Sequence, residues 1–279
     1  MEIANRYELG IVDIRNIIKM LDDVYGVDFK NHALTFFKRR VESFIKYHSF
    51  KDADGFIQKI EKDKDFFETF LKDICVETTE MFRDPSIWRL LKEETLPKNI
   101  LTSPNFKIWL PEVTSGEELY SLAIILKKLK LLDNVQIIGS SISEHHLDRI
   151  RSGIFDPKKI ETNDANYSRI FSEGQLSDYY TLKDDKAYWD VSLIESIKLT
   201  KQNIIFDDYP KGTKLILFRN QMIYYNQILQ ERFMKIMYNS LVPGGHLLIG
   251  NNERIEYWNS EKDYVLVSDS ESIYKKRLS

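Results

Sequence analysis

The chain has 279 residues, of which 43% are hydrophobic and 30% are charged, a composition typical of a globular protein with one large domain or two modest ones. A net charge of -3 excludes a global electrostatic attraction to nucleic acid or to an acidic membrane surface. The single cysteine, Cys75, excludes an internal disulfide. Because the chain also lacks a signal-peptide pattern at its start and any apolar run long enough to span a bilayer, we expect a cytoplasmic protein.

Hydrophobic spacing in the first 95 residues predicts helices and no sheet. Apolar residues recur at helical intervals up to residue 21, and Gly26 is suited to end that helix. Further helices are predicted at 34–45, 54–62, 66–74 and from residue 85 onward. The segment LPKNILTSPN then predicts a linker, because it contains two prolines and several polar residues. We therefore expect a helical domain with its linker over residues 1–97 and a second domain over residues 98–279.

Strands and helices alternate in the second domain, which predicts an α/β fold with a Rossmann-like, doubly wound parallel sheet. Buried strands are expected at 106–110, 135–141 and 214–220, each followed by a helical pattern, and a closing strand pair is expected over 264–278. The stretch 176–204 breaks the alternation because it is rich in β-branched and aromatic residues. It predicts a small inserted antiparallel β-subdomain.

Ligands of doubly wound sheets bind at the carboxyl ends of the strands, beside helix N-termini. Polar residues gather after three predicted strands: Thr114, Ser115, Gly116, Glu117 and Glu118; Ser140, Ser141 and Ser143; Arg219 and Asn220. A purely structural alternative exists for the first turn, because it also fits the capping-box pattern. The five histidines lack zinc-type spacing, and the chain has neither a Gly-x-Ser-x-Gly elbow nor a phosphate loop. We therefore expect no metal centre, no triad hydrolase and no nucleotide hydrolase.

Six segments, read in order, resemble the CheR-type chemotaxis-receptor methyltransferases: VETTEMFRDPSIW (76–88), WLPEVTSGEELYSLAIIL (109–126), SISEHHLDRIRSGIF (141–155), QNI (202–204), LFRNQMIYY (217–225) and LVPGGHLLIG (241–250). The resemblance extends over nearly the whole chain. It implies the transfer of a methyl group from S-adenosylmethionine to glutamate side chains of a chemotaxis receptor or a related signalling protein. It also implies the helical N-terminal domain and the small β-subdomain.

The resemblance also implies where the cofactor binds. Thr79 and Arg83 match the family residues that contact the cofactor near its transferable methyl group. Gly116 with Glu117 or Glu118 matches the turn whose acid binds the amino group of the cofactor's methionine. At the nucleoside end, the matched positions are Ser141, Asn203 and Ile204.

Arg219, Asn220 and Tyr224 match a family run that lines the substrate side, and the first two are also expected to contact the cofactor. Arg83 and Tyr224 are the candidate catalytic residues, because their side chains could orient a carboxylate by hydrogen bonds. The alternatives are a surface salt bridge for Arg83 and core packing for Tyr224. No metal and no strong base is needed, since a glutamate with a pKa of roughly 4.3 is already ionised at neutral pH. The enzyme would supply in-line proximity and exclusion of water, worth roughly 7–11 kcal/mol.

The sequence departs from the family pattern at three cofactor-facing places. Pro111 and Glu112 stand where the family has small residues, which let the backbone approach a ligand closely. Ser141 replaces an aspartate that holds ribose hydroxyls, a change expected to weaken cofactor binding by roughly tenfold or more. Glu77 replaces an asparagine, and Met81 replaces a phenylalanine nearby. Together these changes predict weakened or lost S-adenosylmethionine binding.

Two hypotheses therefore stay open at the level of sequence. The chain is either a working protein-glutamate methyltransferase with an altered pocket, or a CheR-shaped binding module that holds a receptor or signalling partner without catalysis. The basic helix with Lys38, Arg39 and Arg40 fits either hypothesis, and it equally fits a solvated helix face. The insertion at 176–204 could dock a receptor tail by strand addition. No nucleic-acid partner and no membrane insertion is predicted, and the sequence does not indicate an oligomeric state.

Overall fold

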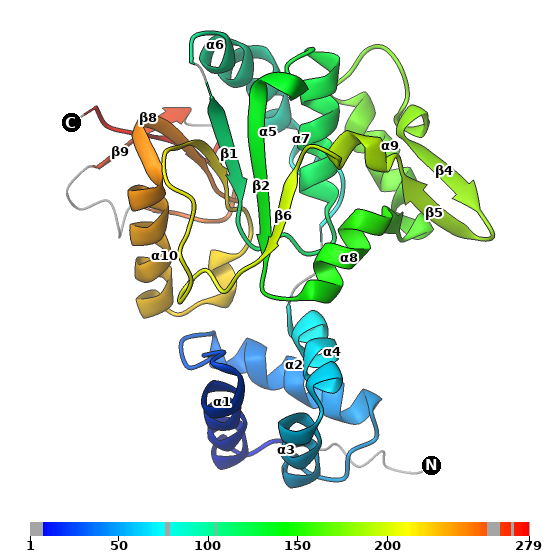
Figure 1. The fold of residues 1–279 in the computed structure, drawn as a ribbon, viewed down its shortest axis with the longest axis vertical. Helices are drawn as coiled ribbons and strands as arrows, with labels where there is room; N and C mark the ends of the chain where they lie inside the picture. Colours follow the sequence, from blue (N-terminus) through cyan, green and yellow to red (C-terminus); the bar gives the residue numbers. More distant parts are fainter. Residues whose placement is uncertain (1–7, 76–78, 104, 256–262, 269–270, 279) are drawn as a thin grey trace. The chain divides into compact units, whose positions relative to one another are not determined.

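The computed structural model describes residues 8–75, 79–103, 105–255, 263–268 and 271–278 (Figure 1). These residues form two compact units. The first unit contains the described residues up to 75 together with Met222–Arg232, and the second contains the others. Glu77, one of the departures from the family pattern, lies outside the described residues.

Within the described residues up to 75, the first unit consists of four helices: α1 (Ile11–Tyr25), α2 (Leu34–Tyr47), α3 (Ala53–Lys62) and α4 (Lys64–Ile74) (Figure 1). Gly26 ends α1 with a left-handed φ of 65°, and the side chains of Asp52 and Asp63 accept hydrogen bonds from backbone N–H groups at the starts of α3 and α4. The apolar faces meet in an aromatic core that includes Phe44 and Phe70. The all-helical character predicted for this part of the chain is confirmed.

A seven-stranded sheet forms the centre of the second unit, in the order β6-β2-β1-β7-β8-β10-β9 (Figure 1). Its strands are β1 (Phe106–Leu110), β2 (Val135–Ser141), β6 (Lys198–Lys201), β7 (Thr213–Leu217), β8 (Leu241–Leu248), β9 (Tyr264–Ser268) and β10 (Ile273–Lys276). The first five in the order pair in parallel, and β10 pairs antiparallel with both β8 and β9. The predicted doubly wound sheet and the predicted closing strand pair are confirmed.

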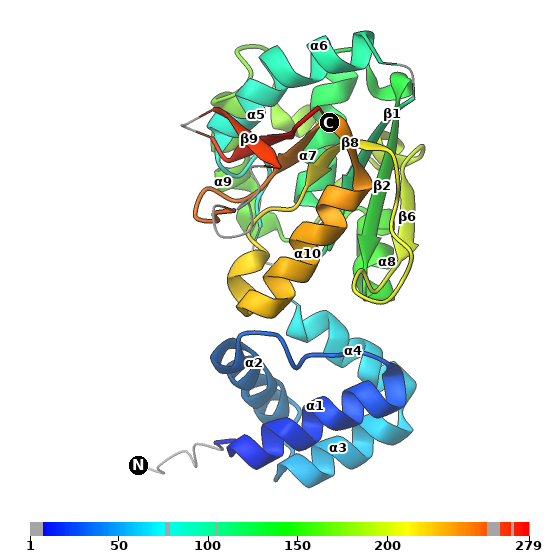
Figure 2. The ribbon, with the colours of Figure 1, turned by 90° about the vertical axis from the view of Figure 1, so that its left-hand side faces the viewer.

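The helices of the second unit are α5 (Pro85–Leu90), α6 (Leu96–Leu101), α7 (Glu117–Lys128), α8 (Glu144–Ser152) and α9 (Ile160–Ser168). The unit also contains the part of α10 (Gln227–Ser240) that begins at Phe233, and α10 leads directly into β8 (Figure 2). The structure differs from expectation between α5 and β1. A π-helical turn at Leu91–Thr95 joins α5 to α6, so most of the segment expected to be a linker is helical. Pro97, which has no N–H to donate, lies in the first turn of α6, directly after this π-helical turn.

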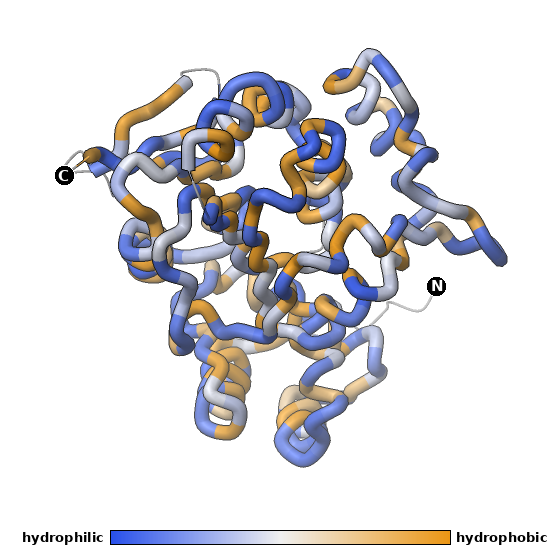
Figure 3. Tube along the Cα trace, turned by 45° about the horizontal axis from the view of Figure 1, so that its top comes forward, coloured by the Kyte–Doolittle hydropathy of each residue, from blue (hydrophilic) through white to orange (hydrophobic). Residues whose placement is uncertain are grey.

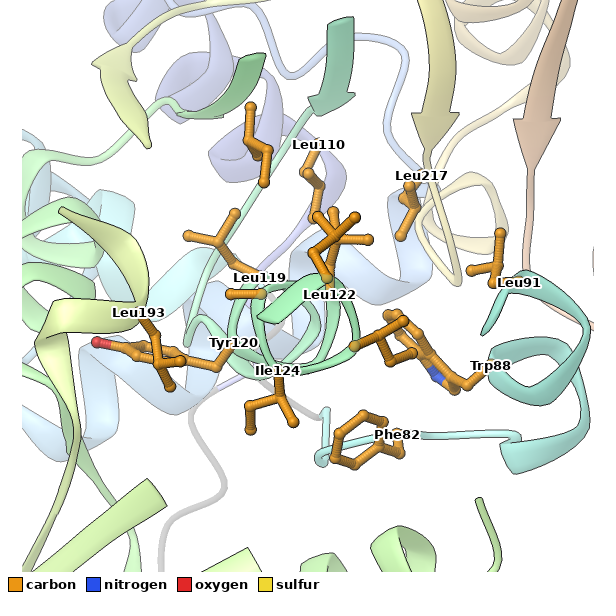
Figure 4. Packing of buried hydrophobic residues seen from close by; sticks show 14 of the residues in the cluster. Phe82, Trp88, Leu91, Leu110, Leu119, Tyr120, Leu122, Ile124, Leu193 and Leu217 are labelled. Atoms are coloured by element: carbon orange, nitrogen blue, oxygen red, sulfur yellow. The ribbon is translucent and has the colours of Figure 1, made fainter. Parts of the chain in front are cut away.

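Helix α7 is central to the larger hydrophobic core. Figure 4 shows its side chains surrounded by residues of β1, β7, α5 and the segment before α5, and the members Leu122, Ile124 and Trp88 have no solvent exposure. Leu215 and Leu217 of β7 join this core, whereas Ile216, between them, belongs to the other face, since side chains alternate along a strand. The short turn at 111–116 places the N-terminus of this largely buried helix at the carboxyl end of β1.

A second, three-stranded antiparallel sheet has the order β3-β5-β4, with β3 (Ile154–Phe155), β4 (Tyr180–Lys183) and β5 (Lys186–Trp189). The predicted small antiparallel β-subdomain is thus confirmed. Part of the stretch 176–204 does not belong to this small sheet, because β6 is an edge strand of the large sheet. Hydrophilic and hydrophobic residues alternate along single elements in both units (Figure 3), as amphipathic helices and half-buried strands require.

Candidate cofactor site

The turn between β1 and α7 lies at the carboxyl edge of the large sheet, next to the end of β2. The N–H of Val113 donates to the carbonyl of Ser140 at 2.8 Å, which ties the two strand ends together. Gly116 then adopts φ 91°, and a Cβ at this position would lie 2.9 Å from Cγ1 of Ile150. Both the backbone conformation and the space therefore require glycine immediately before α7.

Gly116→Ala is expected to lower the free energy of unfolding by roughly 2–4 kcal/mol, since it combines an unfavourable φ with an overpacked contact. Gly26→Ala is the matched control, because Gly26 has a similar φ of 65° but a methyl group there would have no atom within 4 Å. Urea denaturation of both variants should show a loss at least about 1 kcal/mol larger for Gly116→Ala. Equal losses would mean that α8 accommodates the methyl group at no cost.

Glu117, the first residue of α7, is fully buried and already has a cationic partner. Its carboxylate accepts a hydrogen bond from the Ser115 hydroxyl and forms an ion pair with Nζ of Lys159 at 2.7 Å. The same Nζ donates to the carbonyl of Thr79 at 2.7 Å. A buried charge is tolerated only when it is paired and hydrogen-bonded, and Lys159 satisfies that requirement while holding the segment before α5 against α7.

Glu118 belongs to a second ionic network, centred on Arg219 just beyond β7. Nη1 of Arg219 lies 2.7 Å from Glu118, and Nη2 lies 2.7 Å from Asp84 and 3.1 Å from the carbonyl of Arg83. The Arg219 side chain has no solvent exposure. Burial raises the pKa of Glu118 above its ordinary value, although the charges of Arg219 and Arg83 act in the opposite direction. The network joins the ends of β1 and β7 to the segment before α5.

Two buried hydroxyl groups at this edge have no hydrogen-bond partner within the described part of the chain. They are Oγ1 of Thr79 and Oγ of Ser143, which precedes α8. Ser141, at the end of β2, differs from them because its hydroxyl lies 3.1 Å from Nδ1 of His146 and accepts a longer bond of 3.4 Å from the N–H of Ser143. An unsatisfied buried hydroxyl is costly, so these two positions have capacity for a polar ligand.

Two family models match the chain in succession. Residues 13–75 match the all-alpha domain of CheR methyltransferase, and residues 77–271 match its SAM-binding domain. The chain belongs to the CheR methyltransferase family. The resemblance implied by the sequence motifs is confirmed, and the fold and family are those of S-adenosylmethionine-dependent methyltransferases.

Curated relatives match the CheR chain over almost its full length. A chemotaxis protein methyltransferase of Borreliella burgdorferi is 27% identical over 279 residues, covering 94% of this chain and 96% of the relative. One from Listeria monocytogenes is 26% identical over 252 residues, covering 90% and 92%. Among solved structures, a SAM-dependent O-methyltransferase from Thermotoga maritima has a TM-score of 0.39 and 11% identity, covering 75% of this chain and 72% of that one.

The two candidate catalytic residues of this CheR chain lie in different units. Arg83 precedes α5, and its carbonyl accepts a hydrogen bond from the Trp88 indole at 2.9 Å. Tyr224 groups with the helical unit, where its ring lies 4.4 Å from that of Phe36 and its carbonyl accepts the N–H of Ala33 at 2.8 Å. The ring contact with Phe36 is the kind of contact that the core-packing alternative for Tyr224 requires. A joint role of Tyr224 with Arg83 stays a prediction.

Asn203 and Ile204 follow β6, at the same edge as the end of β2. The N–H of Gln202 donates to the carbonyl of Ser141 at 2.8 Å, so the loop begins in register with β2. Oδ1 of Asn203 accepts the N–H of Ile205 at 3.3 Å, and Ile204 is buried. The side chain of Asn203 thus helps to shape its own loop, and its contact with the cofactor's adenine stays a prediction.

Asn220 adopts φ 58° and is held by an acid that the sequence patterns did not single out. Oε2 of Glu253 accepts the N–H of Asn220 at 2.9 Å and the N–H of Gly250 at 2.7 Å. A Cβ on Gly250 would lie 2.9 Å from the backbone nitrogen of Asn220, which explains a glycine there. Glu253 thereby fixes the turns that follow β7 and β8.

The departures from the CheR pattern occupy different environments. Met81 is fully buried: its N–H donates to Asn163 at 2.9 Å, and its sulfur accepts the Ser121 hydroxyl at 3.6 Å. It therefore packs in the core of the second unit. Pro111 is buried and Glu112 is half-buried at the end of β1, with Glu112 at a left-handed φ of 59°.

Sequence patterns alone missed Lys159, Asp84 and Glu253 as members of the site. Lys159 lies in a short charged stretch after a proline and has the pattern of a surface residue, and Glu253 lies in a polar loop. Asp84 lies inside the MFRDP motif, and this motif is the one sequence signal that could have indicated Asp84 as a member of the site. Each of the three acquires its role from a partner at least 33 positions away in the chain, namely Glu117, Arg219 and Asn220.

The basic helix is only partly solvated. Lys38 pairs with Glu8 at 3.1 Å and with Glu42 at 3.7 Å, and the guanidinium of Arg40 donates to the carbonyls of Asp73 and Cys75 at the end of α4. Arg39 is exposed. Among the described residues, no three His, Cys, Asp or Glu side chains are placed to hold a metal ion. No helix in the described ranges has the length and apolar character needed to cross a bilayer.

Proposed function

We propose that this CheR protein transfers a methyl group from S-adenosylmethionine to glutamate side chains of a chemotaxis receptor or a related signalling protein. The observation that carries the proposal is the buried Arg219 network, which joins the motif segments MFRDP, SGEE and FRN at the ligand edge of the sheet. Relatives named as chemotaxis protein methyltransferases support the substrate class. An intact ionic framework at this edge favours catalysis over the non-catalytic alternative.

The residues present fit the cofactor. Gly116 lets the backbone turn sharply at the start of α7, where N–H groups face the carboxyl edge of the sheet. The unsatisfied hydroxyls of Thr79 and Ser143 offer hydrogen bonds to a polar ligand. Asn203, Ile204 and Asn220 would complete the binding set, while Ser141 contributes less than an aspartate because its hydroxyl is engaged with His146.

S-adenosylmethionine, when bound, supplies an electrophilic methyl group on a sulfonium sulfur. The protein's own residues then have three tasks: to hold the cofactor, to orient the accepting carboxylate and to exclude water. Arg83 would orient the carboxylate by charge-assisted hydrogen bonds. No residue has to remove a proton, because the acceptor glutamate is ionised at neutral pH.

The proposal is tested by incubating the protein with methyl-labelled S-adenosylmethionine and the cytoplasmic fragment of a chemoreceptor from the same organism. A glutamate methyl ester releases its label as volatile methanol in alkali, whereas N-methyl products do not. We expect alkali-labile label on the receptor fragment. Label that resists alkali, or no transfer to any chemoreceptor fragment of that organism, would contradict the proposed acceptor.

Arg83→Ala is expected to reduce the rate of methyl-ester formation by about 10- to 100-fold, the effect of losing one charged hydrogen bond. Arg89→Ala is the matched control, since Arg89 is exposed on the adjoining helix α5. The measurement is kcat/KM with the receptor fragment, accompanied by a thermal melt of each variant. If both variants retain the wild-type rate, Arg83 does not orient the acceptor.

A further inference from the structure

The acids at the carboxyl edge of the large sheet are not equivalent. Glu117 is paired with Lys159, and Glu118 and Asp84 are both paired with Arg219. Glu112 lies two residues beyond β1 and is half-buried. Among the described residues its carboxylate has no hydrogen-bond or ion-pair partner. Of the three acids in the turn from β1 into α7, Glu112 is therefore the one for which the described residues show no protein cation.

Partial burial disfavours the ionised form of Glu112. Burial raises the pKa of Glu112 to about 7, and no neighbouring charge contributes to the shift. Its backbone adopts φ 59°, a conformation that residues other than glycine and asparagine seldom adopt. The buried Pro111 before it and the bond from the N–H of Val113 to Ser140 restrain this conformation. A strained, unpaired acid at the ligand edge of a doubly wound sheet is a feature that a cationic ligand would stabilise.

We propose that Glu112 is the carboxylate that meets the positive charge of S-adenosylmethionine in this protein. The inference rests on the proposed function and adds a recognition residue to it. The methionine end of the cofactor carries an ammonium and a sulfonium cation, and the two acids implied by the family resemblance, Glu117 and Glu118, are already neutralised by Lys159 and Arg219. Glu112 thus replaces the small family residue with a ligand for the cofactor.

A consequence is that cofactor binding depends on pH near neutrality. Below pH 7 the Glu112 carboxyl holds a proton and offers no charge, whereas above pH 7 it is ionised. The affinity for a cationic ligand should therefore rise with pH through this range. Binding should also release a proton at pH 7, because the cation favours the ionised carboxylate.

The experiment is titration calorimetry of the full chain with S-adenosylmethionine and with S-adenosylhomocysteine, at about pH 6 and pH 8. For wild-type protein we expect S-adenosylmethionine to bind more tightly at the higher pH. Glu112→Gln should weaken S-adenosylmethionine binding by about tenfold or more at pH 8 and by little at pH 6. Glu173→Gln, at an exposed loop residue, is the matched control and should behave as wild type.

The two ligands distinguish the two cations. S-adenosylhomocysteine has the ammonium group but no sulfonium, so a loss for both ligands assigns Glu112 to the ammonium, and a loss for S-adenosylmethionine alone assigns it to the sulfonium. The inference is overturned if Glu112→Gln binds S-adenosylmethionine as tightly as wild type at pH 8, or if wild-type affinity is the same at both pH values. Wild-type protein that binds neither ligand would overturn the proposed function as well.

Discussion

Arg219→Ala should lower the free energy of unfolding by about 3–5 kcal/mol, because it leaves two acids, Glu118 and Asp84, without their buried cation. The Arg219 side chain has no solvent exposure, so water cannot take its place without opening the site. The measurement is urea denaturation at about pH 8. Binding of S-adenosylhomocysteine should also be lost, since the network holds the segment before α5 at the ligand edge.

Arg151→Ala is the matched control for this prediction. Arg151 also contacts two acids, Glu144 at 2.7 Å and Asp148 at 2.8 Å, but its side chain is 44% exposed. Exposed ion pairs contribute little, so the change in unfolding free energy should stay within about 1 kcal/mol. Similar losses for the two variants would contradict the argument that burial, rather than the number of ion pairs, makes Arg219 important.

The destabilisation by Arg219→Ala should also depend on pH. Burial already raises the pKa of Glu118 in spite of Arg219, and removal of the guanidinium raises it further. In the variant, the pKa of Glu118 is therefore higher in the native state than in the unfolded chain. Between these two pKa values the native state binds more protons than the unfolded state, so stability falls as pH rises. The deficit should be smaller at pH 5 than at pH 8. A deficit independent of pH would assign the loss to packing instead of charge.

The second large effect is expected for Lys159→Met, which removes the cation from the fully buried Glu117. We expect a loss of about 3–5 kcal/mol in unfolding free energy, the magnitude found when one partner of a buried pair is deleted. The double variant Glu117→Gln with Lys159→Met removes the stranded charge. It should therefore recover a large part of the loss, which makes the pair's coupling energy measurable by a double-mutant cycle.

The outcome for the Lys159 pair separates two explanations. If Lys159 acts through Glu117, the double variant is more stable than Lys159→Met alone. If the bond from Lys159 to the carbonyl of Thr79 dominates, the double variant is no better than the single one, because that bond is lost in both. Thermal melts of the single and double variants at one pH provide the comparison.

The sequence by itself determined the kind of fold and the edge at which a ligand would bind. Helical spacing before residue 75 and alternation of strands with helices after residue 105 are local patterns. They sufficed to predict the fold class because the buried side of a helix or strand appears in its sequence as a periodic hydrophobic pattern. Motifs such as SGEELYS and FRNQMIYY were specific enough to indicate the CheR family. The expected linker was wrong in its local structure because tertiary packing of Leu96 and Ile100 overrides the weak helix signal of a proline-containing segment.

Only the tertiary structure decided which charges at that edge are paired. Glu117 and Glu118 are neighbours in a helical turn, yet they point to different cations, Lys159 and Arg219, that are supplied by distant segments. No spacing rule contains that information, since the partners lie 42 and 101 positions away. Electrostatic pairing depends on distance and burial in three dimensions, and for that reason the unpaired state of Glu112 became visible only once the chain was folded.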